Sequence, residues 1–462
     1  MAINESLVES IVKQVVSRID GAAACSTLHG IFPDMNEAIE HARQAETVVR
    51  AMSMEQREKI ITNIRKKTRE NAEKLARMGV EETGMGNVPH KILKHQLLAD
   101  RTPGTEDITT TAWSGDKGLT LIEMGPFGVI GAIAPSTNPS ETILCNAIGM
   151  IAGGNTVVFC PHPSAVKTSQ FAINLVNEAS MDAGGPDNVA VSVSDPTMEN
   201  SAIMMKHKDI QLIAATGGPG VVTAVLSSGK RGIGAGAGNP PALVDETADL
   251  HKAAKDIVDG CTFDNNLPCI AEKEIVAEES IIDELMYYMV HDEGCYLANE
   301  DEQRRLTETA LPGGKLNRKC VGRDAKTLLG MIGVTAPEGT RCITFKGPKE
   351  HPLIAEELMM PILGVVPAKD FQDAVNQAVW LEHGNRHSAH IHSKNIDHIT
   401  TYAKAIDTAI LVKNAPSYAA LGFGGEGYCT FTIASRTGEG LTSASTFTKR
   451  RRCVMSESLC IR

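Results

Sequence analysis

The segment Pro126–Pro161, PFGVIGAIAPSTNPSETILCNAIGMIAGGNTVVFCP, contains the clearest indication of the fold class of this chain. Within it, residues 127–135 are a short apolar run with β-branched side chains, residues 140–154 follow a helical pattern that ends in two glycines, and residues 155–161 are a second β-branched run. A strand, a helix and a strand in this order predict a βαβ unit. Because both runs are apolar on successive residues, the parallel sheet is expected to have helices on both faces.

Strand and helix patterns alternate in the same way farther along the chain. Helices are expected at 164–185, at 197–207 and from 217, with strands at 188–194 and 209–216. A second α/β pattern begins near residue 239, with strands at 241–246 and 274–278 and a helix near 250–259. The chain is therefore expected to hold two parallel sheets, with ligands beyond the carboxyl ends of their strands.

The amino-terminal part has helical patterns. Ser53 and Gln56 fit a capping box and predict one charged helix that runs to about Gly79. Residues 4–19 place a wide apolar stripe on one helix face, and residues 21–32 are a linker rich in small residues. Residues 1–20 are therefore interpreted as an amphipathic docking helix for another protein. The alternative is a first helix that packs its stripe on its own domain.

Composition excludes several classes of protein. The 462 residues suggest about three domain-sized units, and 45 Lys+Arg against 56 Asp+Glu give a net charge of −11. This acidic balance argues against broad binding to nucleic acid or to anionic lipid. No apolar run is long enough for a transmembrane helix. The eleven cysteines include no C-x-x-C pair, which argues against a disulfide framework and a structural zinc site.

Two glycine-rich turns are candidate ligand sites. The turn Thr216–Gly220 lies between a strand and a helix, where backbone N–H groups and the helix dipole can receive a pyrophosphate. The alternative is a tight turn without a ligand. A second run, Gly232–Gly238, does not match G-x-G-x-x-G, because residue 237 is Ala. Alone, it indicates only a close approach of the backbone to a neighbouring group.

Cys269 is the candidate nucleophile among the cysteines. It ends the segment Thr262–Cys269, TFDNNLPC, in which polar residues precede a Pro-Cys step. A thiol on a turn near backbone N–H donors is expected to have a lowered pKa. Cys145, Cys160 and Cys342 lie in apolar runs and are expected to be small core residues.

Five motifs occur in order along the chain. They are PSTNP (135–139), ATGGPGVV (215–222), GIGAGAGNPPALVD (232–245), TFDNNLPC (262–269) and EELMMPIL (356–363). Together they resemble the CoA-acylating branch of the aldehyde dehydrogenase superfamily, in particular the propionaldehyde and acetaldehyde dehydrogenases of bacterial microcompartments. The resemblance spans essentially the whole chain, and residues 1–20 are similar to the encapsulation peptides of that group.

The resemblance implies an aldehyde dehydrogenase-like α/β fold, with two Rossmann-like parallel-sheet domains and a β oligomerisation element. The implied division is a cofactor-binding domain at 33–231, a catalytic domain at 232–425 and an oligomerisation segment at 426–462. Residues 113–123 would contribute to the oligomerisation element, and the β-like tail at 428–445 suits an edge strand. The resemblance further implies that the protein forms a dimer or tetramer. It also implies that residues 1–20 bind a shell protein and that the enzyme lies in a microcompartment of the cytoplasm.

The resemblance also implies roles for single residues. Cys269 matches the nucleophile, and Asn138 matches the amide that cradles the oxyanion together with the Cys269 N–H. Glu357 matches the carboxylate that holds the nicotinamide ribose. The remaining matches lie in cofactor-binding motifs and are Pro135, Ser136, Thr137, Thr216, Gly217, Gly218 and Gly236. The implied cofactors are NAD and coenzyme A, with no metal.

Two departures from the hydrolytic relatives are informative. Their glutamate base, in a motif E-L-G-G-K, is replaced here by Ala235, and residues 230–244 contain no Asp or Glu. Water therefore lacks its usual base, whereas a thiol such as CoA is a strong nucleophile without one. In place of V-V-x-K-P the chain has Val157–Pro161, with Cys160 where the lysine would be, which leaves NAD versus NADP open. Neither Cys160 nor His162 is assigned a chemical role.

The predicted reaction is the reversible oxidation of a short aldehyde, with propionaldehyde favoured, by NAD⁺ and CoA to acyl-CoA and NADH. An acetaldehyde dehydrogenase of the same type is the first alternative, and a phosphorylating or hydrolytic semialdehyde dehydrogenase is the second. A catalytically inactive interaction protein of a shell is the non-enzymatic alternative. The presence of Cys269, Asn138 and Glu357 argues against it.

Overall fold

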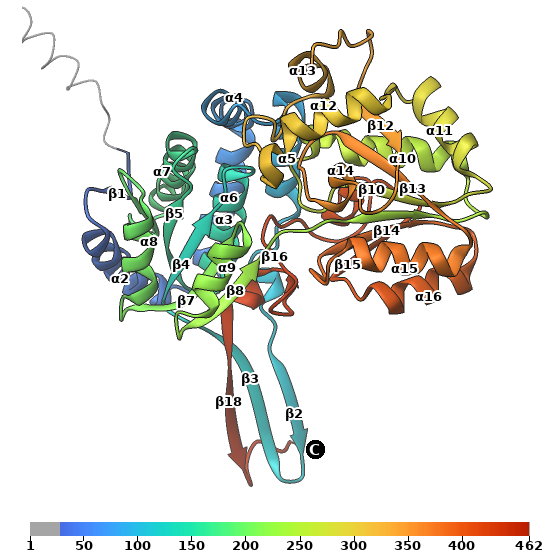
Figure 1. Ribbon diagram of the computed structural model, residues 1–462. Coiled ribbons are helices and arrows are strands. Elements are labelled where there is room, and N and C mark those ends of the chain that lie inside the picture. Colours follow the sequence, from blue (N-terminus) through green and yellow to red (C-terminus); the bar gives the residue numbers. More distant parts are fainter. Residues whose placement is uncertain (1–27, 462) are drawn as a thin grey trace, which may run out of the picture.

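Two parallel sheets lie side by side, and a long antiparallel arm projects from them (Figure 1). The computed structural model describes residues 28–461. The elements of the first sheet and its helices are β1 (Ile31–Phe32), α2 (Met35–Ala51), α3 (Met54–Glu70), α4 (Ala72–Thr83), α5 (Val88–Arg101), β4 (Val129–Ala134), α6 (Pro139–Ala152), β5 (Thr156–Pro161), α7 (Val166–Asp182), β6 (Ala190–Val193), α8 (Met198–Lys206), β7 (Ile210–Thr216), α9 (Pro219–Leu226) and β8 (Arg231–Ala235).

The first sheet has the strand order β1-β6-β5-β4-β7-β8, and every neighbouring pair is parallel. Both of its faces are buried, as alternate residues of β5 show. Val157 and Phe159 pack with α3, α6 and α7, whereas Val158 and Cys160 pack with α2, α8 and α9. This burial on both faces explains why the strand is a continuous apolar run.

The second sheet has the order β11-β12-β13-β10-β9-β14-β15, again with parallel pairs throughout. Helices α10 and α11 cover one face, and α12, α13, α15 and α16 cover the other. Its elements are β9 (Pro241–Val244), α10 (Leu250–Thr262), the 3₁₀ helix η2 (Phe263–Asn266), β10 (Glu274–Glu278), α11 (Ile282–His291), β11 (Cys295–Leu297), α12 (Glu300–Ala310), α13 (Ala325–Met331), β12 (Cys342–Lys346), α14 (Pro352–Ala355), β13 (Ile362–Ala368), α15 (Phe371–Leu381), β14 (Ser388–His392), α16 (Ile396–Ile406) and β15 (Ile410–Lys413). The predicted α/β fold with two parallel sheets is confirmed.

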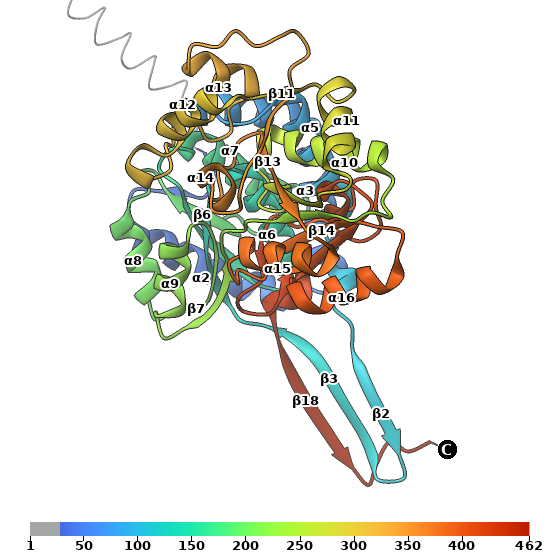
Figure 2. The ribbon, with the colours of Figure 1, turned by 45° about the vertical axis from the view of Figure 1, so that its right-hand side comes forward.

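The arm is a three-stranded antiparallel sheet of β2 (Thr111–Gly115), β3 (Gly118–Pro126) and β18 (Thr448–Ser456). Strand β18 pairs with β3 along all nine of its residues, from Thr448 opposite Pro126 to Ser456 opposite Gly118. Both views show the arm pointing away from the two sheets (Figure 2). The last strand of the chain thus joins a hairpin that lies more than 300 residues earlier in the sequence.

Two expectations about local structure are wrong. The helix expected from Ser53 to Gly79 is two helices, because Asn71 leaves the helical path and its side-chain amide donates to the Lys67 carbonyl. The tail at 428–445 forms only the two-residue strands β16 (Ile433–Ala434) and β17 (Gly440–Leu441). The long strand is β18, whose basic residues are exposed on the arm and follow no apolar alternation.

Within residues 28–461, no helix is long and apolar enough to cross a membrane.

Candidate active site

The carboxyl ends of β5, β4 and β7 bring together two of the predicted cofactor motifs. Pro135, Ser136 and Thr137 follow β4 directly, and Thr216 is the last residue of β7, its neighbour in the sheet. In an open parallel sheet, ligands bind at this edge. The structure therefore places both motifs at the edge of the sheet where ligands are expected to bind.

The turn from β7 to α9 exposes backbone to open space. Gly218 caps α9, and the Gly217 N–H donates to the Ala235 carbonyl at 3.1 Å. A Cβ atom added to Gly217, Gly218 or Gly236 would meet no atom within 4 Å. The turn therefore leaves room for a group at the start of α9, where free N–H groups and the helix dipole attract a phosphate. The residues present fit a dinucleotide.

The second sheet contributes residues at the opposite strand ends. Gly238 precedes β9, Cys269 precedes β10, Glu357 precedes β13 and His387 precedes β14. These four strands are consecutive neighbours in the sheet, in the order β13-β10-β9-β14. Residues from four distant parts of the sequence therefore converge at the amino ends of the central strands.

Gly238 is the centre of this convergence. Its N–H donates to Glu357 Oε1 at 3.3 Å. A Cβ atom at Gly238 would lie 2.9 Å from the His387 ring and 3.1 Å from the Cys269 carbonyl oxygen. Only glycine allows the backbone to pass between these two groups. Cys269, Glu357 and His387 therefore lie around one backbone position.

The nucleophile candidate follows a strained loop. Asp264, Asn265 and Asn266 have φ values of 49°, 54° and 66°, in the left-handed region that Asp and Asn tolerate best. The buried Asn266 amide donates to the carbonyls of Cys261 and Glu272, which ties the two ends of the loop together. The polar residues of TFDNNLPC therefore determine the backbone shape that presents Cys269.

Asn138 lies at the amino end of α6 without capping it. Its Oδ1 accepts a hydrogen bond from Lys94 Nζ at 2.5 Å, while its Nδ2 has a weak 3.4 Å contact with Thr137 Oγ1. Lys94 Nζ also donates to Asp264 Oδ2 at 2.5 Å. Asp264 lies five residues before Cys269 in the sequence. The amide assigned to the oxyanion is thus linked to the loop of the nucleophile through one buried lysine.

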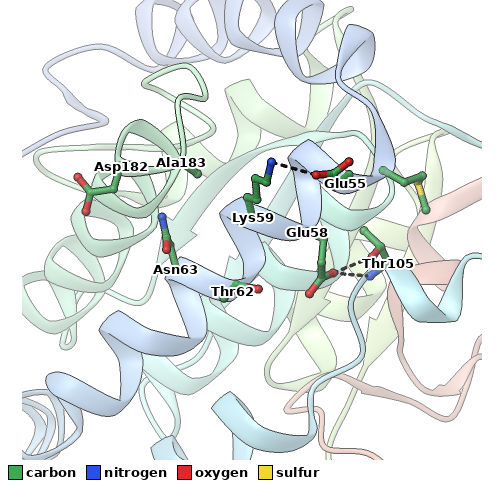
Figure 3. Close-up of a pocket in the computed structure, with 9 residues that line it drawn as sticks. Glu55, Glu58, Lys59, Thr62, Asn63, Thr105, Asp182 and Ala183 are labelled. Carbon is green, nitrogen blue, oxygen red and sulfur yellow. Dashed lines mark hydrogen bonds and ion pairs between the residues drawn. The ribbon is translucent and has the colours of Figure 1, made fainter.

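A surface hollow of about 620 Å³ lies elsewhere on the molecule (Figure 3). It is lined by Glu55, Glu58, Lys59 and neighbouring residues of α3, together with Thr105 and Asp182. The Lys59 ammonium pairs with Glu55 at 3.0 Å, and Glu58 accepts from Thr105. None of the residues that line the hollow belongs to a predicted motif, so the volume alone does not indicate the site of chemistry.

Comparison with known proteins places this geometry in a family. The model of the aldehyde dehydrogenase family matches residues 8–292. The chain belongs to the aldehyde dehydrogenase family. It is 43% identical over 461 residues to a propanal dehydrogenase (CoA-propanoylating) of Citrobacter freundii, with 99% of this chain and 100% of the relative covered. It is 44% identical over 467 residues to the acetaldehyde dehydrogenase (acetylating) EutE of Salmonella typhimurium, with the same coverage.

A solved structure of an aldehyde dehydrogenase is also similar to this chain, in fold and in sequence. The propionaldehyde dehydrogenase from the Clostridium phytofermentans fucose utilisation bacterial microcompartment superposes with a TM-score of 0.93 at 76% identity, covering 94% of this chain and 100% of that one. The resemblance to the CoA-acylating branch, which rested on five short motifs, is therefore confirmed.

Within this aldehyde dehydrogenase, the Cys269 thiol has a higher pKa than the sequence suggested. Burial first, and the nearby Glu357 carboxylate second, raise its pKa to about 12. The Lys273 ammonium and the N–H groups of Cys269 and Ile270 lower it by less. The expected lowered pKa is therefore wrong for the protein alone, because desolvation of the thiolate outweighs the donors around it.

His387 is a site residue that the sequence did not reveal. It is fully buried, its Nδ1 contacts Ser388 Oγ at 3.0 Å, and its Nε2 has no hydrogen-bond partner among residues 28–461. Burial first, and Lys273 second, lower the pKa of its imidazole to about 4. A neutral ring with a free nitrogen is a potential proton acceptor. No motif of known spacing marks this residue, because only the fold brings it to Gly238.

Cys160 and His162 lie at the end of β5. Cys160 is 2% exposed and contacts the Met204 thioether at 3.6 Å, and burial raises its pKa to about 12. His162 Nδ1 accepts a hydrogen bond from the Ser164 N–H at 3.1 Å. The buried positions of Cys145, Cys160 and Cys342 confirm the expectation of small core residues.

Proposed function

We propose that this protein is an NAD-dependent CoA-acylating aldehyde dehydrogenase whose preferred aldehyde is propionaldehyde. The observation that carries the proposal is Cys269, which lies beside Gly238 with Glu357 and His387 around it. Ala235 supports a thiol acceptor, since the segment from β8 to β9 carries no carboxylate that would activate water. The 76% identity to a propionaldehyde dehydrogenase supports the three-carbon aldehyde.

In the first half-reaction, the Cys269 thiol releases its proton to solvent, the thiolate sulfur forms a bond to the aldehyde carbon, and the carbonyl oxygen becomes an alkoxide. The Asn138 Nδ2 and the Cys269 N–H would donate to this oxygen, and each such donor contributes about 3–4 kcal/mol to the transition state. NAD⁺, when bound, would supply the acceptor for the hydride that leaves this carbon. When the alkoxide collapses and the carbon loses hydride, Cys269 carries a thioester.

In the second half-reaction, the thiol of CoA attacks the thioester carbon and Cys269 leaves as the thiolate. His387 would accept the CoA proton at Nε2, because the ring is neutral and that nitrogen has no other partner among the described residues. Thr216, Gly217, Gly218 and Gly236 would hold the dinucleotide phosphates at the start of α9. Glu357 would hold the nicotinamide ribose, and Pro135, Ser136 and Thr137 would line the ligand site beyond β4.

We assign residues 33–231 to a cofactor-binding domain, 232–425 to a catalytic domain and 426–462 to an oligomerisation segment. Residues 113–123 would join this segment in the arm of β2, β3 and β18, which would pair subunits into a dimer or tetramer. The docking helix at 1–20 and most of the linker at 21–32 lie outside the described residues. We propose that residues 1–20 bind a shell protein and place the enzyme in a microcompartment of the cytoplasm.

The decisive experiment follows NADH after mixing the protein with propionaldehyde, NAD⁺ and CoA. We expect turnover that needs CoA and is lost in Cys269→Ala, while Cys453→Ala, an exposed cysteine of the arm, retains it. Equal turnover with water or phosphate in place of CoA would overturn the acylating assignment. The same assay with acetaldehyde separates the two aldehydes, because a higher kcat/KM for acetaldehyde would replace propionaldehyde as the substrate.

A further inference from the structure

The Asn138 amide lies against a buried cluster of four charges. Lys91, Lys94, Glu141 and Asp264 are each at most 2% exposed. Lys94 Nζ contacts Asp264 at 2.5 Å and Glu141 at 3.0 Å, and Lys91 Nζ contacts Asp264 at 3.0 Å. Two cations and two anions make the cluster neutral as a whole. Such a group costs desolvation energy, so its presence beside the site calls for a physical reason.

One lysine of the cluster determines which way the Asn138 amide faces. A lysine ammonium donates hydrogen bonds and accepts none, so the atom 2.5 Å from Lys94 Nζ is the amide oxygen. The Asn138 NH₂ group must then face away from Lys94. Its contact with Thr137 Oγ1, at 3.4 Å, is long and leaves it free to donate.

The surroundings keep Lys94 charged and in place. Burial alone would lower the pKa of Lys94, but the carboxylates of Asp264 and Glu141 outweigh burial and raise it. The Phe431 ring lies 5.6 Å from the ammonium. For Lys91, in contrast, burial prevails and lowers the pKa. Lys91 donates to the Thr137 carbonyl and to Asp264 and makes no hydrogen bond to the Asn138 side chain.

We propose that Lys94 is a positioning residue for the oxyanion hole: it holds the Asn138 oxygen, fixes the amide with its NH₂ toward the reacting carbonyl, and strengthens that donor by polarising the amide. A cation on the amide oxygen draws electron density from the nitrogen, which makes the N–H bonds better donors. Lys94 itself touches neither aldehyde nor cofactor. This inference rests on the proposed function, in which Asn138 stabilises the alkoxide.

The test is a double-mutant cycle measured as kcat with propionaldehyde, NAD⁺ and CoA. We expect Asn138→Ala to lose about 10²–10³-fold and Lys94→Met to lose roughly 10–100-fold. Because Lys94 acts through the amide, the double variant should be no slower than Asn138→Ala alone. Losses that multiply in the double variant would overturn the proposal.

Lys91→Met is the matched control. It removes a buried charge from the same cluster without removing a contact of the Asn138 side chain, so its loss should multiply with that of Asn138→Ala. A second readout is alkylation of Cys269 by iodoacetamide without cofactor. Since the charges that act on this thiol are Glu357 and Lys273, Lys94→Met should leave the alkylation rate unchanged. A slower alkylation would show a general distortion of the site and contradict the proposal.

A charge-balanced variant guards against misfolding. Lys94→Met leaves the cluster with one excess negative charge, whereas Lys94→Met/Glu141→Gln keeps it neutral. If Lys94→Met alone is insoluble, the double-mutant cycle is measured in the Glu141→Gln background. In that background, Glu141→Gln replaces the unaltered enzyme as the reference, and Lys94→Met and Asn138→Ala are added to it singly and together. Absence of CoA-dependent turnover in the unaltered enzyme would overturn the proposed function, whereas normal turnover with multiplying losses would overturn only the role of Lys94.

Discussion

The charge of Glu357 is one of two causes that make Cys269 a weaker acid. Burial has the larger effect on the pKa of this thiol, and the Glu357 carboxylate raises the pKa further. Glu357 also accepts the Gly238 N–H, so its position is fixed from the backbone. A group that engages the Glu357 oxygens, as the ribose hydroxyls are proposed to do, would weaken its effect on the sulfur. Cofactor binding and activation of the nucleophile would then be coupled through one carboxylate.

Glu357→Gln should lower the pKa of Cys269. Removing a negative charge favours the thiolate, so alkylation by iodoacetamide at pH 8 should become about 3–10-fold faster, which corresponds to roughly one half to one pKa unit. The rate is measured between pH 7 and 10 in the absence of cofactor. The adjacent exposed Glu356→Gln is the control and should leave the profile unchanged. An unaltered or slower rate in Glu357→Gln would show that the carboxylate does not act on the thiol.

His387 should serve the second half-reaction. In His387→Gln we expect the first burst of NADH to persist, because the thioester on Cys269 still forms. Steady turnover should fall by roughly 10²-fold, because no side chain then accepts the proton of the CoA thiol that attacks the thioester. Since the pKa of His387 is lowered to about 4, the ring is neutral above that pH, so turnover should not be lost through its protonation between pH 5 and 8. Rapid quench of the acyl-enzyme measures both steps. A burst that falls as much as the turnover would contradict this role.

At the scale of elements, the glycines of two connections have different tasks. Gly218 faces open space at the start of α9, whereas Gly238 is enclosed between His387 and Cys269 at the entry to β9. The first leaves room for a ligand, and the second lets two parts of the protein approach each other. Substitution by alanine distinguishes the two tasks.

Gly218→Ala should weaken binding of the dinucleotide without unfolding the protein. Its backbone has φ −63°, which alanine adopts readily, and the new methyl group meets no atom within 4 Å. We expect an unchanged Tm and a KM for NAD⁺ raised by about tenfold, since the methyl fills the space proposed for the phosphates. Gly238→Ala should instead lower both Tm and kcat, because its methyl would lie 2.9 Å from the His387 ring. An unchanged KM in Gly218→Ala would place the phosphates elsewhere.

In the molecule as a whole, the arm presents large apolar side chains that are exposed. Trp113 is 53% exposed and Val454 is 59% exposed, on strands that project from the two sheets (Figure 2). Large exposed apolar residues on such a projection suit contact with a second subunit. The double variant Trp113→Lys/Val454→Lys should therefore sediment as a smaller species than the unaltered protein, with the near-ultraviolet circular dichroism of the folded chain. An unchanged mass would exclude the arm as the subunit contact.

Residues 1–20 should act independently of the catalytic fold. Their removal is expected to leave kcat unchanged, and their fusion to a fluorescent protein should concentrate the fluorescence in a microcompartment shell. The matched control replaces Ile11 and Val15 by Glu, which breaks the apolar stripe while keeping the length. Diffuse fluorescence in cells that make the shell would contradict the proposed role of residues 1–20 in targeting the enzyme to the microcompartment.

Local sequence pattern predicts the fold class, and the family motifs predict much of the chemistry. Continuous β-branched runs, as in 155–161, occur where a strand is covered on both faces, so local pattern alone predicted the parallel sheets. Comparison with the E-L-G-G-K motif of hydrolytic aldehyde dehydrogenases places Ala235 where their glutamate base stands, and this replacement favours CoA over water as the acyl acceptor. Local pattern does not predict the break at Asn71, which depends on a single side-chain hydrogen bond, or the basic strand β18, which depends on pairing with a distant hairpin.

The electrostatics of the site, in contrast, depend on how the chain is folded. The pKa of a thiol depends on desolvation and on charges that lie far away in sequence, so a turn with N–H donors was no guide to the raised pKa of Cys269. His387 and Lys94 carry no motif, and they became visible only when strands and helices placed them beside Gly238 and Asn138. Local patterns encode secondary structure and family, whereas the contacts that orient an amide or neutralise a ring exist only after the chain has folded.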